Sequence, residues 1–155
     1  MKIQIKNLHD RFIITGKEKR KLKRLAVIAA ETVNKTGDFF LSVVFTNDEH
    51  ITTLNKIYRK KNKPTDVLAF PMDLNPSSFP DIPWMIGEII ISIDTCQKNA
   101  EKEEITLEQK IFQMFIHGFI HLLGYHHDTP EKYEKMSDLH KSILTKFYML
   151  NRSKK

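Results

Sequence analysis

Three histidines near one glycine are spaced as the ligands of a single metal ion. His117 and His121 are four residues apart, so on a helix both imidazoles lie on one face, roughly 6 Å apart along the axis. Gly124 can adopt left-handed backbone angles that end the helix, which lets His127 return to the same ion. Three neutral imidazoles leave one tetrahedral position open, as in catalytic zinc sites. We therefore predict one divalent ion, Zn²⁺ or else Ni²⁺, on His117, His121 and His127.

Two other side chains are weaker candidates as ligands of this ion. His126 adjoins His127, but its offset from Gly124 is one residue short. Cys96 is the only cysteine and lies about twenty residues upstream, whereas a closed structural zinc site usually needs cysteine as a further ligand. A lone histidine on an apolar helix is more often a core residue, but three at this spacing favour a metal site.

The composition indicates a soluble globular protein. Its 155 residues suffice for one domain with a substantial core, so we treat residues 1–155 as a single domain. No apolar run reaches about eighteen residues and no signal-peptide core follows the start, which predicts a cytoplasmic protein without a membrane partner. One cysteine excludes an internal disulfide. The formal net charge of +6 favours a polyanionic partner.

Hydrophobic periodicity predicts four strands and five helices in mixed order. Strands are expected at 2–6, 39–46, 67–70 and 85–93, and helices at 17–34, from 47 or 48 to 58, at 94–103, from a Thr106 capping box to 123, and from Pro130 onward. This order indicates an α+β (mixed α/β) fold in which helices flank the sheet. Three of the six prolines fall in residues 72–83, which predicts a surface loop.

Apolar positions within these elements predict what each one buries. The run Ile89 to Ile91 suggests a central strand that is covered on both faces. The helix that ends at residue 58 should turn Ile51, Leu54 and Ile57 inward. The last helix should bury Tyr133, Met136, Leu139, Ile143, Leu144 and Phe147.

The histidine spacing is similar to that of the metzincin peptidases, with one departure. Metzincins carry glutamate directly after the first histidine, as general base for the attacking water. This chain has Gly118 there, so the metal geometry is kept and the peptidase base is missing. Gly118 therefore argues against peptide hydrolysis.

Three blocks together resemble the YbeY family of bacterial endoribonucleases. They run from Leu54-Asn55 through Tyr58-Arg59 and Lys63-Pro64-Thr65-Asp66 to Phe70-Pro71, from Gly87-Glu88-Ile89 to Ser92, and from His117-Gly118 to His127. The resemblance implies a single domain with a four-stranded, mostly parallel sheet flanked by about five helices. It also implies a zinc-like ion on the three histidines. The family commonly has Asp where this chain has Glu88 and His126.

The resemblance further implies a metal-dependent endoribonuclease specific for single-stranded RNA. Its expected role is in maturation of 16S ribosomal RNA and in ribosome quality control, with ribosomal RNA and the small ribosomal subunit as partners and no DNA partner. Two other functions stay open: a non-catalytic RNA-binding assembly factor with a structural metal, and a small metallopeptidase. If removal of the metal abolishes RNA cleavage but leaves the fold intact, the result would favour the endoribonuclease over the two other functions.

Catalytic and substrate-binding residues follow in part from the same resemblance. Arg59 matches the arginine that the family requires, and with His117 it is the expected catalytic residue. Arg59, Lys60, Lys61 and Lys63 are expected to bind the RNA backbone, since guanidinium and ammonium groups suit phosphate. Candidate general bases are Asp66, Glu88 and His126, and the nucleophile stays open between a water on the metal and the 2′-hydroxyl of the RNA.

Overall fold

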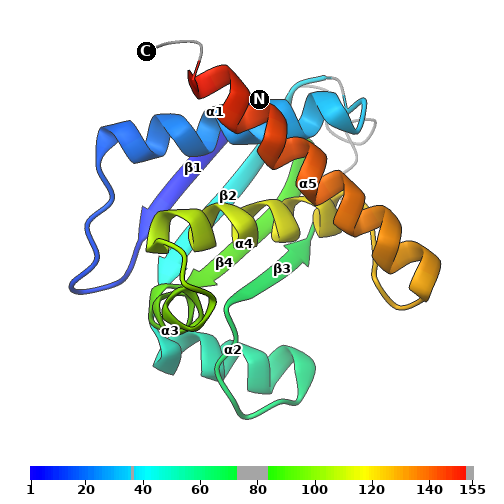
Figure 1. The fold of residues 1–155 in the computed structure, drawn as a ribbon. Coiled ribbons are helices and arrows are strands. Elements are labelled where there is room, and N and C mark those ends of the chain that lie inside the picture. The colour runs from blue at the N-terminus through cyan, green and yellow to red at the C-terminus, as the bar shows by residue number, and fades with distance from the viewer. Residues whose placement is uncertain (36, 73–83, 153–155) are drawn as a thin grey trace.

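Four strands form one mixed sheet in the computed structural model, which describes residues 1–35, 37–72 and 84–152 (Figure 1). The strands are β1 (Lys2–Asn7), β2 (Phe39–Thr46), β3 (Val67–Pro71) and β4 (Trp84–Ser92). Their order in the sheet is β1-β2-β4-β3. β1 pairs with β2 and β2 with β4 in parallel, whereas β3 pairs with β4 antiparallel. The predicted mostly parallel sheet is confirmed, while the loop predicted at 72–83 lies, apart from residue 72, outside the described residues.

Within the described residues five helices accompany the sheet, as predicted. They are α1 (Gly16–Thr32), α2 (Asp48–Arg59), α3 (Ile93–Glu103), α4 (Leu107–Leu122) and α5 (Pro130–Arg152). Asn47 caps α2 by accepting the His50 backbone N–H, and Thr106 with Gln109 forms the predicted capping box of α4. No helix of the described ranges is long and apolar enough to cross a membrane.

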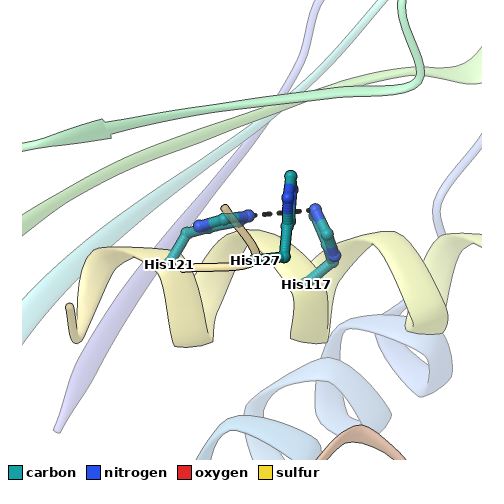
Figure 2. Close-up of side chains that lie close together, drawn as sticks. All are labelled: His117, His121 and His127. Atoms are coloured by element: carbon teal, nitrogen blue, oxygen red, sulfur yellow. Dashed lines mark hydrogen bonds between the residues drawn. The ribbon is translucent and has the colours of Figure 1, made fainter. Parts of the chain in front are cut away.

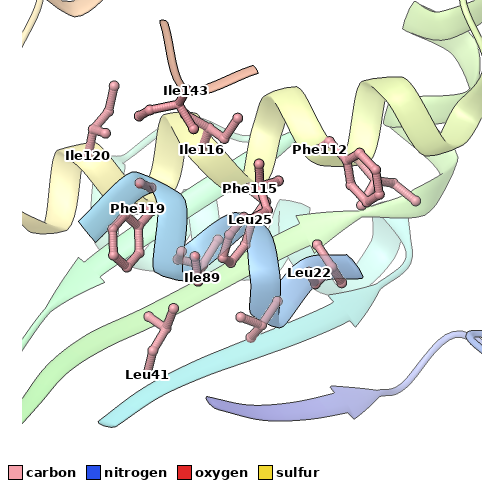
Figure 3. Packing of buried hydrophobic residues seen from close by; sticks show 14 of the residues in the cluster. Leu22, Leu25, Leu41, Ile89, Phe112, Phe115, Ile116, Phe119, Ile120 and Ile143 are labelled. Carbon is pink, nitrogen blue, oxygen red and sulfur yellow. The ribbon is translucent and has the colours of Figure 1, made fainter. Parts of the chain in front are cut away.

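The helices cover the two faces of the sheet unequally. In Figure 1, α1, α4 and α5 lie over one face, and in Figure 3 Leu25 of α1 and Phe115 of α4 pack over Ile89 of β4. The other face carries a smaller cluster, in which Ile90 packs with Ile51 of α2. Ile89 and Ile90 are thus buried on opposite faces, which confirms β4 as a central, doubly covered strand.

Two residues predicted to point inward are exposed. Ile57 is 64% exposed because the last buried position of α2 is taken by Asn55, whose Nδ2 donates to the Lys63 carbonyl at 2.9 Å. Tyr133 is also 64% exposed, since the first turns of α5 project past the edge of the sheet (Figure 1). Met136, Ile143 and Phe147, further along α5, are buried as predicted.

Candidate active site

The end of α4 brings the first two histidines together. The Nε2 atoms of His117 and His121 are 3.1 Å apart, as the dashed line in Figure 2 shows. α4 ends at Leu122, and Gly124 then takes a φ of +96°, a left-handed angle that glycine adopts without strain. The N–H groups of Gly124 and Tyr125 close the helix end by donating to the carbonyls of His121 and Ile120. This glycine turn is the one that the spacing predicts.

After the turn, His127 comes back over the same face of α4 (Figure 2). One nitrogen of each ring of His117, His121 and His127 lies within 4.8 Å of the other two. Two nitrogens bound to one tetrahedral zinc ion at about 2.05 Å would lie about 3.3 Å apart, close to the observed 3.1 Å. The donor set and its spacing fit a zinc or nickel ion. His126 is outside this cluster, with its ring centroid 5.9 Å from that of His121.

Burial keeps the two helical histidines neutral. It lowers the pKa of His117 to about 4, helped by the positive charges that His121, His140 and His127 would carry. The pKa of His121 is lowered as well, first by burial and then by His127 and His126. A neutral imidazole keeps the lone pair that a metal needs, so both rings are prepared as ligands at neutral pH.

A cavity of about 420 Å³ connects these histidines to Arg59. Arg59 is the last residue of α2, whereas His117, His121 and His127 come from α4 and the turn after it. The cavity is also lined by two residues that precede β3 and by alternate positions of β3, namely Thr65, Asp66, Val67, Ala69 and Pro71. The fold thus places a guanidinium and four imidazoles, those of the three clustered histidines and of His126, around one cavity.

A second hollow of about 360 Å³ adjoins the first and shares Arg59, Thr65 and Asp66 with it. Lys61 and Lys63 line this second hollow. Lys60, the exposed C-cap of α2 in a left-handed conformation (φ 58°), lines neither hollow. Two of the three predicted substrate-binding lysines therefore lie beside the cavity that holds Arg59.

The three candidate bases are separated by the sheet. Asp66 and His126 line the cavity with the histidines. Glu88 is not among the residues around it and accepts a hydrogen bond from Ser42 Oγ at 2.9 Å. Glu88 alternates with Ile89, which faces α4, so its side chain is on the opposite face of the sheet. Glu88 is therefore unsuited to act as base in this cavity.

Two residues have roles near the site that sequence reasoning did not predict. His140 of α5 has its ring centroid 6.4 Å from that of His117, and its Nε2 donates to the Gln113 carbonyl at 2.9 Å. No spacing signal links a histidine on a separate helix to the motif. Gly118 lines the cavity, but a Cβ there would lie 2.9 Å from Cγ2 of Ile89. Gly118 thus permits close packing of α4 on β4. This is a structural reason for glycine at position 118 that the comparison with metzincins did not suggest.

Comparison with known proteins identifies the family to which this arrangement belongs. The model of the family described as "Endoribonuclease YbeY" matches residues 4–148. The chain belongs to the YbeY endoribonuclease family. A YbeY protein of Halalkalibacterium halodurans is 35% identical over 162 residues, which cover 99% of this chain and 100% of that protein. One from Aquifex aeolicus is 36% identical and covers 83% of each chain.

A further YbeY relative is similar to most of this chain, and a solved structure is similar to it in fold. A YbeY protein of Rhodopseudomonas palustris is 40% identical over 120 residues, which are 76% of this chain and 63% of that protein. The solution structure of a Thermotoga maritima protein superposes with a TM-score of 0.58 at 28% identity. That superposition covers 99% of this chain and 95% of the Thermotoga chain. The family assignment thus extends over the sheet, the helices and the cavity alike.

Proposed function

We propose that this YbeY-family protein is a metal-dependent endoribonuclease that cuts single-stranded RNA in the cytoplasm. Its proposed substrate is 16S ribosomal RNA on the small ribosomal subunit, in RNA maturation and ribosome quality control. One observation carries the proposal, which is that Arg59 and the three histidines line one cavity. A phosphodiester cut needs stabilisation of negative charge on the phosphoryl oxygens, and this cavity gathers groups suited to that task.

Each residue around the cavity has a distinct role in this proposal. His117, His121 and His127 hold a divalent ion, which when bound supplies Lewis-acid stabilisation of a phosphoryl oxygen. Arg59 orients the same phosphate through its planar guanidinium, which can donate two parallel hydrogen bonds. Because Arg59 comes from α2 and the histidines come from α4 and the turn after it, the phosphate is held from two sides.

Neighbouring side chains are placed to accept a proton and to bind the RNA backbone. Asp66 and His126 are the two candidate bases that line the cavity, so either is placed to accept a proton from the nucleophile. Lys61 and Lys63 line the adjoining hollow, where they can hold the backbone of the nucleotide next to the cut. A single strand suits this arrangement better than a duplex, since its backbone can bend into both hollows.

The test compares three substrates under one set of conditions. Metal-loaded protein is incubated with a labelled single-stranded RNA, its duplex and a casein-type protein, with and without chelator. We expect chelator-sensitive cleavage of the single strand, slower cleavage of the duplex and intact casein. A precursor of 16S RNA and an unrelated RNA of equal length then test the ribosomal substrate. Chelator-sensitive proteolysis with intact RNA would overturn the proposal, and tight RNA binding without any cleavage would favour the assembly factor.

A further inference from the structure

The first half of α1 carries a run of positive charge of which only one member is paired with an acid among the described residues. Six of the eight residues from 17 to 24 are Lys or Arg. Lys21 alone among them forms an ion pair with a described residue, its Nζ lying 2.9 Å from Glu108 Oε1. Glu18 is the one acid in the run, but its carboxylate accepts the Thr15 N–H in the helix cap. Four cations share the outer side of α1, opposite its buried stripe: Lys17, Arg20, Lys23 and Arg24.

This charge distribution opposes the stability of the helix that carries it. The amino end of a helix bears partial positive charge, so cations in its first turns are unfavourable. Arg20 also lies three and four residues from Lys23 and Arg24, at the spacing where like charges repel. In α2, by contrast, Lys56 and Arg59 occupy the last turn, where the helix dipole favours cations. An arrangement that disfavours its own helix points to an external anion.

We propose that the outer face of α1, formed by Lys17, Arg20, Lys23 and Arg24, binds the phosphate backbone of the RNA substrate at a distance from the metal cavity. This inference rests on the proposed function for the identity of the polyanion. α1 and α4 cover the same face of the sheet, and the Lys21–Glu108 ion pair joins α1 to the start of α4 (Figure 1). From Glu108 to His121, α4 advances about 20 Å. An RNA must therefore extend well beyond the cavity to reach α1.

The spacing of the four cations suits a nucleic-acid backbone. Lys17 and Arg24 are separated by about 10 Å along the helix axis. Phosphates in a helical strand follow one another at about 3.4 Å along its axis, so this face spans about three of them. Such contacts are independent of base sequence and would add affinity without changing which bond is cut.

The test neutralises three of these cations and compares the variant with a matched control. The variant is Arg20→Gln/Lys23→Gln/Arg24→Gln, and the control is Lys2→Gln/Lys6→Gln/Lys102→Gln, which removes the same charge from exposed positions on β1 and α3. The Kd for a long RNA is measured over a range of salt concentrations. We expect the slope of log Kd against log salt to fall by about 2 in the variant, as for three lost phosphate contacts. The control should keep most of the wild-type slope.

Two further measurements separate binding by α1 from damage to the fold. A short RNA that fills only the cavity should be cut by the variant with wild-type kcat and KM. The Tm of the variant without RNA should rise at low salt, because glutamine removes the repulsion at little cost in helix propensity. A Tm below that of wild type would overturn the argument that the charges disfavour their own helix.

The remaining outcomes decide between RNA and another partner. Equal losses of RNA affinity in variant and control would overturn the proposal, since net charge alone would then explain them. Unchanged RNA binding with lost binding to polyglutamate would also overturn it, and would assign the face to an acidic protein. If the wild type binds RNA without cleaving it and the α1 variant still loses affinity, this inference stands while the proposed function fails.

Discussion

At the scale of single residues, the histidine cluster depends on two rings whose basicity is suppressed by burial. His117 has a pKa of about 4 and the pKa of His121 is lowered too, so both are neutral at pH 7. We predict that His121→Ala loses most of the bound metal, whereas His126→Ala keeps it. Metal analysis after gel filtration measures the metal content of both variants. Full occupancy in His121→Ala, or loss in His126→Ala with none in His127→Ala, would contradict the assignment of ligands.

Proton release on metal binding provides a second check of the same residues. Protonation of imidazole competes with metal binding, so affinity should decrease as the pH falls below neutrality. Because burial already keeps the two helical rings neutral, these two rings should release almost no proton when the ion binds at pH 7. Calorimetry in two buffers of different ionisation enthalpy measures the number of protons released per bound ion. Release of two or more protons would show that the rings are charged before the metal binds.

Arg59 supports a prediction that separates function from stability. The residue is exposed at the end of α2 and lines the cavity, so its removal should not disturb the core. Arg59→Ala should reduce RNA turnover by about a hundredfold or more, as for removal of one transition-state donor, with metal content and Tm near wild type. Arg59→Lys should restore little, since an ammonium lacks the planar fork. Normal turnover in Arg59→Ala would remove this residue from the site.

At the scale of elements, the contact between α4 and β4 depends on the absence of a side chain at residue 118. A Cβ on Gly118 would lie 2.9 Å from Ile89 Cγ2, and both residues are buried. Gly118→Ala should therefore lower the free energy of unfolding by about 1–3 kcal/mol, even though alanine favours helices. Urea denaturation measures the change.

Two control variants test whether the contact with Ile89 causes the loss of stability in Gly118→Ala. Gly16→Ala places a Cβ 3.4 Å from the flexible end of Arg20, so it should cost little. Gly118→Ala combined with Ile89→Ala should be less destabilised than the sum of the single changes, since the close contact is gone. Additive effects would contradict this packing explanation.

A hydrogen-bond cluster joins the starts of α2 and α3 and predicts sensitivity to acid. Partial burial acts to raise the pKa of Asp48, but hydrogen bonds from Thr95, Ser92 and Lys98 outweigh it and hold that pKa below its usual value. A carboxyl whose pKa is lower folded than unfolded stabilises the protein above the unfolded value, about 3.9, and loses this contribution as the pH falls through the folded value.

The corresponding variant is Asp48→Asn. It should be less stable than wild type by about 1–2 kcal/mol at pH 7, because charge-assisted hydrogen bonds are lost. The difference should shrink from pH 7 towards pH 2, as the pH falls towards the lowered pKa of Asp48 and the wild-type carboxyl begins to take up a proton. Urea titrations at the two pH values measure it. A difference that stays constant from pH 7 to pH 2 would rule out the carboxylate charge as its source.

At the scale of the whole molecule, the metal cluster lies beside the core and is not part of it. None of the three histidines is fully buried, whereas the residues of the larger apolar cluster that joins α1, α4, α5 and the sheet are. We therefore predict that chelation abolishes RNA cleavage while circular dichroism stays unchanged. The Tm should fall only by the amount that mass action gives for a bound ion. Loss of helical signal on chelation would mean that the metal is structural, as the assembly-factor alternative requires.

Local patterns in the sequence determined the elements and the metal motif. The spacing of His117, His121 and His127 around Gly124 depends on helical periodicity and on one left-handed residue, both set by neighbouring residues. Strand bounds such as 39–46 follow likewise from local propensity and agree with β2. The roles of Arg59 and the basic loop came from family resemblance, not from any local pattern.

Only the tertiary structure decided which distant residues share a cavity. The order β1-β2-β4-β3 puts β3 beside β4, so that Arg59 and Asp66 reach the histidines, whereas Glu88 falls on the far face. Likewise, the exposure of Ile57 depends on where α2 leaves the sheet, and the need for Gly118 depends on Ile89 of another element. Periodicity tells which side of an element is apolar. What that side meets depends on contacts between residues far apart in the chain, which a single sequence does not encode locally.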